Sequence, residues 1–267
     1  ITVSSGTIAL QTGMSVTAGN FQVTGGQFNA GSRAVTKTGG SFNIAGNGYT
    51  ATATGTLNLD NVSLDPGTGT FGEVNFSANA SSVNNNSLNS IATTNGVRVT
   101  GGTVDFTGQA ITAAAGGISL AAGNSSNVGA LSSSGSITLL NTAITGNAGN
   151  ITLTGAATVF SPGGVTVGAV TANTAGVIDI TGALNASALT VTATTILEVD
   201  ATPVITGPVD LPGSFKADGG VNNASLTIAN SGNTTFDPGA NTFSALAKTA
   251  AGTLTIQKPI SVETSFT

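Results

Sequence analysis

The chain has 267 residues, a net charge of −5 and a pI near 4.3, and only 6% of its residues are charged. Cys and His are absent, which excludes disulfides, thiolate sites and catalysis by a nucleophile paired with histidine. The few basic residues are scattered, which argues against nucleic-acid binding, and no apolar run approaches the roughly 18 residues of a membrane span.

The composition predicts a folded, all-β chain. Thr, Val and Ile are abundant, whereas disordered chains are poor in β-branched residues. Strong helix formers are scarce, and no stretch repeats apolar residues at i, i+3, i+4 and i+7. The lack of Cys, together with the low charge and the Ser, Thr, Asn and Gly content, predicts an extracellular protein of a bacterial or archaeal cell surface.

Thirteen apolar–polar–apolar triplets recur along the chain, and this alternation is typical of half-buried β-strands. In chain order they are Phe21–Val23, Phe42–Ile44, Leu57–Leu59, Val74–Phe76, Val97–Val99, Ile118–Leu120, Ile137–Leu139, Ile151–Leu153, Val165–Val167, Ile178–Ile180, Leu189–Val191, Leu226–Ile228 and Leu254–Ile256. Further strands are expected around Ile196–Val199, Phe215 and Thr234–Phe236. Such short strands bury little alone, so many of them must stack.

The spacing of these strands, a little under 20 residues on average, predicts a β-solenoid of about 13–15 coils. Tandem β-sandwich domains are the alternative. They place strands about 8–12 residues apart, and twice that spacing is close to the period found here. Recurrent Gly-Gly pairs and the scarcity of aromatic residues, one Tyr and no Trp, favour the solenoid. We therefore expect a solenoid array over residues 1–199 and its continuation over 214–267.

Two segments break the pattern. Residues 79–96 are rich in Asn and Ser around Asn84, Asn85 and Asn86, and predict a surface loop or a wide corner. Residues 200–213 contain Pro203, Pro208 and Pro212, which cannot donate to a sheet ladder. This second segment predicts a bend, an edge segment or a domain seam.

Several runs resemble known secreted proteins. Gly149–Gly155, Gly164–Gly168 and Gly176–Asn185 resemble the filamentous-haemagglutinin class of adhesins. Ala247–Ile256 is similar to the autotransporter-associated β-strand repeat, with Ala250 where that repeat has Gly. Both resemblances imply a right-handed parallel β-helix displayed outside the cell.

Carboxylates are the remaining candidates for chemistry. Glu198 and Asp200 lie at i and i+2, where a strand would place them on one face about 6–7 Å apart, as in paired glycosidase carboxylates. Solvated acids beside a Pro-rich segment are the alternative that we favour. Together with Asp210 they are also the candidate ligands for adventitious calcium. Asp60 and Asp65 flank the turn sequence Asp65–Gly67 and are interpreted as turn residues.

No catalytic, cofactor or metal site is therefore assigned, and the chain is interpreted as a non-enzyme. A sugar-cleaving groove needs stacking aromatics, which Tyr49 alone does not supply. The phenylalanines Phe21, Phe42, Phe76, Phe106 and Phe236 predict core stacking. The Asn-x-Ser/Thr triplets at Asn61, Asn79, Asn185 and Asn223 are interpreted as chance occurrences in this composition.

Two functions follow from these expectations. The first is a rod-like stalk or passenger segment of a surface adhesin, with a cell-surface glycan or protein as partner. The second is a self-assembling subunit of an extracellular filament, sheath or surface layer. Residues 1–10 and 260–266 are strand-like and carry no capping helix, which predicts pairing with another copy or with neighbouring segments of a longer chain.

Overall fold

The computed structural model describes residues 1–44, 48–77, 79–83, 90–220 and 223–267. It confirms the prediction of an all-β solenoid: parallel strands stack in about 13 turns. Asn84, Asn85 and Asn86, the centre of the predicted Asn-rich loop, lie outside the described residues. The described part of the chain divides into two compact units. Unit 1 comprises residues 1–135 and 142–146, and unit 2 comprises residues 136–141 and 147–267.

Unit 1 is built from four groups of stacked strands. One sheet has eight strands, in the order β1 (Thr2–Val3), β4 (Phe21–Val23), β7 (Ser41–Ile44), β10 (Ser63–Asp65), β12 (Ser81–Val83), β15 (Thr103–Asp105), β18 (Asn124–Ser126) and β21 (Ile144–Thr145). A second group runs β3 (Met14–Val16), β6 (Ala34–Thr38), β9 (Thr56–Asp60), β11 (Glu73–Phe76), β14 (Gly96–Val99) and β17 (Gly117–Leu120). The others are β13 (Ile91–Ala92), β16 (Ile111–Ala113) and β19 (Leu131–Ser133), and β2 (Thr7–Ala9), β5 (Gln27–Gly31) and β8 (Tyr49–Ala51).

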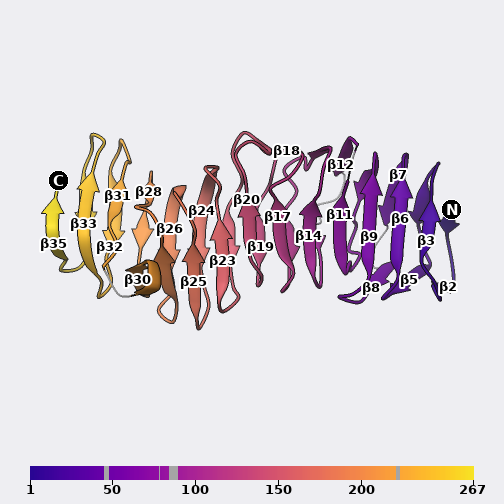
Figure 1. Cartoon of the computed structure of the whole chain (residues 1–267), viewed down its shortest axis with the longest axis horizontal. Coiled ribbons are helices and arrows are strands. Elements are labelled where there is room, and N and C mark those ends of the chain that lie inside the picture. Colours follow the sequence, from indigo (N-terminus) through magenta and orange to yellow (C-terminus); the bar gives the residue numbers. More distant parts are fainter. Residues whose placement is uncertain (45–47, 78, 84–89, 221–222) are drawn as a thin grey trace. The chain divides into compact units, whose positions relative to one another are not determined.

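Unit 2 contains two principal stacks, and Figure 1 shows their strands as successive rungs. One runs β20 (Ile137–Leu139), β23 (Thr158–Ser161), β25 (Val177–Ile180), β27 (Ile196–Val199) and β30 (Ser214–Ala217). The other runs β22 (Ile151–Leu153), β24 (Thr166–Ala172), β26 (Asn185–Val191), β28 (Val204–Ile205), β31 (Leu226–Ile228), β33 (Thr242–Lys248) and β35 (Ser261–Phe266). A branch from β26 adds β29 (Val209–Asp210), β32 (Thr234–Asp237) and β34 (Leu254–Ile256), and the one helical element of the described residues is the 3₁₀ turn η1 (Asp218–Gly220).

The strand ladders within each unit are parallel, which rules out the β-sandwich alternative. Twelve of the predicted triplets lie wholly within strands, and the remaining one, Val165–Val167, begins one residue before β24. In-register partners are about one predicted period apart: Phe21 pairs with Phe42, and Ile178 pairs with Leu197. The triplets thus mark the most apolar strands, while each coil also contains shorter strands with weaker alternation.

The core is a set of columns in which each coil contributes one side chain, because neighbouring parallel strands lie about 4.8 Å apart in register. The predicted core role of the phenylalanines is confirmed. Phe21 and Phe42 are fully buried, and their rings stack with centroids 4.6 Å apart. A second aromatic column contains Phe28, Tyr49 and Phe71, with successive centroid distances of 5.7 and 5.0 Å. Burial raises the pKa of Tyr49.

The Pro-rich segment 200–213 lies inside unit 2, and the division between the units falls at residues 136–147. Within the segment, β28 and β29 have two residues each. Pro208 lacks a donor but still accepts the backbone N–H of Leu189 at 3.1 Å. The prolines therefore shorten the strands of this coil while the ladder continues past them.

Candidate functional site

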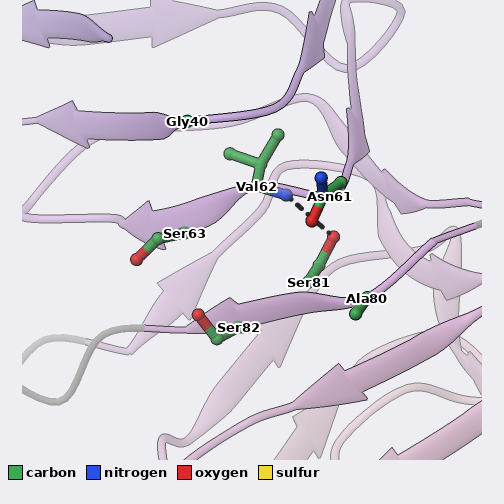
Figure 2. A pocket seen from close by; sticks show the side chains of 7 residues that line it. All are labelled: Gly40, Asn61, Val62, Ser63, Ala80, Ser81 and Ser82. Carbon is green, nitrogen blue, oxygen red and sulfur yellow. Dashed lines mark hydrogen bonds between the residues drawn. The ribbon is translucent and has the colours of Figure 1, made fainter. Parts of the chain in front are cut away.

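A shallow hollow lies on the surface of unit 1 (Figure 2). It has a volume of about 370 Å³ and is lined by Gly40, Asn61, Val62, Ser63, Ala80, Ser81 and Ser82. The corner before β10 is fixed by a hydrogen bond from the backbone N–H of Val62 to Ser81 Oγ, at 3.3 Å. The lining offers hydroxyl groups and one amide, which can hydrogen-bond a polar ligand but supply no titratable group.

The candidate pair Glu198 and Asp200 lies on unit 2, with Glu198 half-buried on β27 and Asp200 exposed just after it. Glu198 alternates with the buried Leu197 and Val199 and so faces outward, and Asp200, two residues on, lies on the same exposed side as predicted. Glu198 is in register with Asp179 on β25 and with Lys216 on β30. The structure therefore extends the predicted pair into a larger charged group.

Asp179 is one member of this group that sequence reasoning missed. It is the middle residue of the triplet Ile178–Ile180, so it faces outward, and it precedes Glu198 by 19 residues, about one coil. That spacing is the signal that could have found it. Burial, followed by the nearby charges of Asp200 and Asp218, raises the pKa of Asp179.

The other candidate acids do not join this group. Asp210 lies on β29, which pairs with β26 and β32, so the three proposed calcium ligands are divided between different stacks. Asp60 accepts hydrogen bonds from the backbone and side-chain nitrogens of Asn79, at 3.0 and 2.8 Å. Asp65 Oδ1 accepts the backbone N–H of Gly67 at 3.4 Å, in keeping with its interpretation as a turn residue. No cluster of three potential metal ligands occurs among the described residues.

Two lysines occupy inward positions at corners, where sequence reasoning saw only scattered basic residues. Lys37 is fully buried, in register with Val16 and Leu59, and its Nζ donates to the carbonyls of Thr38 and Gly39. Burial lowers its pKa. Lys248, in register with the buried Ile228, donates in the same way to the carbonyl of Ala250 at 2.6 Å. Both lysines thus close the corner that follows their own strand.

The Asn-x-Ser/Thr triplets occupy unlike positions. Asn61 and Asn79 are exposed, whereas Asn185 lies half-buried on β26, and the half-buried Asn223 donates to Glu263 Oε1 at 2.6 Å. None of the helical segments in the described part of the chain has the length and hydropathy needed to cross a membrane.

The fold defines the chain as a parallel β-solenoid, and among the described residues its outer faces carry small polar side chains and a carboxylate-rich group on unit 2. Comparison with protein-family models, with curated proteins and with solved structures found no match.

Proposed function

We propose that the chain is a non-enzymatic structural protein of the cell exterior, a rod-like stalk or passenger segment of a surface adhesin. The observation that carries this proposal is the unbroken stacking of parallel strands through each unit, with an inward residue buried at nearly every coil. Each added coil extends such a fold without changing its cross-section, as a spacer requires. The low charge and the lack of cysteine favour an exterior location.

The proposal is tested on cells that produce the protein. Antibodies raised against the purified chain should label intact cells, and protease added outside should remove that label. If the chain itself contains the binding surface of an adhesin, beads coated with it should also bind a cell-surface glycan or protein. If it is only the stalk, such beads should bind nothing. Label that appears only after lysis would overturn the exterior role.

A second function, a self-assembling subunit of a filament or surface layer, is favoured by a different observation. Ile8 is 42% exposed although its register partner Phe28 is buried, and Phe266 is 57% exposed although its partner Leu246 is buried. Both side chains occupy column positions on β2 and β35, the outermost strands of their ladders. A further coil, from another copy or from another segment of a longer chain, would cover them.

Sedimentation and electron microscopy over a wide concentration range separate the two functions. Assembly through these columns predicts polymers that grow with concentration and that Phe266→Asp abolishes. Leu140→Asp is the matched control, because Leu140 is 39% exposed but lies outside the strands, after β20. Single particles at every concentration would exclude the assembling subunit and leave the stalk.

A further inference from the structure

Four of the chain's acidic residues gather on one outer surface of unit 2. Asp179, Glu198, Asp200 and Asp218, which we call the carboxylate face, lie on or directly after β25, β27 and β30. Asp179 and Glu198 are directly opposite each other in the ladder. Like charges in opposed positions destabilise strand pairing.

Asp179 is a half-buried member of this face. Its Oδ1 atom is buried and accepts no hydrogen bond from any residue that the structure describes. An ionised carboxylate in such a place loses water without gaining a donor, which is unfavourable. A neutral carboxyl group there has a much smaller desolvation cost.

The groups that face Asp179 do not offset its charge directly. From β23, its register partner is the uncharged Val159. From β27 come Glu198 and, just after the strand, Asp200, while η1 contributes Asp218. Lys216, the cation of this surface, lies on β30 in register with Glu198 and thus two strands away from Asp179.

We propose that the carboxylate face is a pH-sensitive seam: unit 2 holds the β25–β27 contact more tightly in acid, when Asp179 takes up a proton, than at neutral pH. The direction of this pH dependence follows from the linkage between proton binding and folding. The folded chain binds this proton more tightly than the unfolded chain does, because burial, Asp200 and Asp218 raise the pKa of Asp179. Stability is therefore lost as pH rises from the ordinary aspartate pKa through the raised one.

Hydrogen–deuterium exchange of the full chain tests this, read on peptides covering β25 and β27 between about pH 4 and about pH 7 and corrected for the intrinsic pH dependence of exchange. Protection in wild type should fall with rising pH across this range. Asp179→Asn should keep protection high and nearly independent of pH. Glu263→Gln is the matched control, because it removes one negative charge from the same unit, leaves an oxygen to accept from Asn223, and should retain the wild-type profile.

A second variant keeps the proposal testable if Asp179→Asn folds poorly. Asp200 is exposed, so Asp200→Asn should fold normally while removing a charge that acts on Asp179. Carbon-detected NMR titration of the aspartate carboxyl groups should then show the Asp179 midpoint above that of a peptide in wild type, and lower in Asp200→Asn. A wild-type midpoint at or below the peptide value, or unchanged pH dependence in Asp179→Asn, would overturn the proposal.

Discussion

The corners at residues 65–71 in unit 1 and 237–243 in unit 2 share the pattern Asp-Pro-Gly-x-x-Thr-Phe. In both, the aspartate Oδ1 accepts the glycine N–H, at 3.4 Å from Asp65 and 2.8 Å from Asp237. In both, the proline carbonyl accepts the N–H three residues on, and the closing Phe71 or Phe243 is fully buried. One short sequence thus builds the same corner in two different units.

The fifth position of the pattern is where the two corners differ. Unit 1 has Gly69, where an added Cβ would lie 3.3 Å from both Ile44 and the Phe71 ring. Unit 2 has Asn241, whose Nδ2 donates to the carbonyls of Leu211 and Gly213 at 3.0 and 2.9 Å. Its Oδ1 accepts the N–H of Phe215 at 2.8 Å. The same turn is therefore fixed by close packing in one place and by a side chain that bridges coils in the other.

Removing the closing aromatic ring should have the largest effect at both corners. Phe71→Ala and Phe243→Ala should each destabilise their own unit by about 3–5 kcal/mol, because a buried ring is lost and a cavity remains. Phe71 stacks on Tyr49 at 5.0 Å, and Phe243 packs against Phe236 at 5.5 Å. Chemical denaturation measures the loss, and hydrogen exchange assigns it to a unit. Phe266→Ala removes an exposed ring and should change the free energy of unfolding little. An equal loss there would show that burial of the ring does not explain the effect at the two corners.

The glycine of the unit 2 corner should come next. Gly239 has a φ of +57°, and an added Cβ would lie 2.0 Å from the carbonyl oxygen of Leu211. Gly239→Ala combines left-handed strain with overpacking and should cost about 2–4 kcal/mol.

Gly182→Ala is the matched control for that substitution. Gly182 also has a left-handed φ, +90°, but no atom lies within 4 Å of its added Cβ. Strain alone should then cost about 1–2 kcal/mol. Thermal unfolding of the two variants, compared directly, gives the share of the destabilisation that comes from the contact with Leu211. Equal losses of stability would show that this contact contributes nothing.

The bridging side chain should rank third. Asn241→Ala leaves the Phe215 N–H and the carbonyls of Leu211 and Gly213 without this partner, and should cost about 1–3 kcal/mol. Asn150→Ala removes one hydrogen bond, from the Ala169 N–H, at an exposed residue, and should cost less than about 1 kcal/mol. Urea unfolding of both decides whether the bridging of coils matters; similar losses would show that it does not.

The residues that face the core could be predicted from the sequence, whereas many of the contacts between outward-facing residues could not. Alternation in Phe21–Val23 or Ile178–Ile180 identifies buried columns, because period two separates the faces of a strand wherever it lies. The inward position of Lys37 and the gathering of Asp179, Asp200 and Asp218 depend on which coils are neighbours. That register varies: Val74 pairs with Val97, 23 residues on, whereas Val74 and Leu57 are 17 apart. Because the corners vary in length, the sequence does not show which outward residues lie side by side on neighbouring coils.

The ion pair at the unit 2 corner should give the smallest effect and the opposite pH dependence to the carboxylate face. Lys258 Nζ lies 2.7 Å from Asp237 Oδ2, but the lysine side chain is 51% exposed, and such pairs contribute little. The hydrogen bond from Lys258, followed by that from the Gly239 N–H, lowers the pKa of Asp237. Stability from this group is therefore present above the ordinary aspartate pKa and lost as pH falls through the lowered one. Lys258→Met should lower the unfolding midpoint slightly at neutral pH, less in high salt, and not at all in strong acid. A loss as large as that of Gly239→Ala would mean that charge, and not backbone packing, holds this corner.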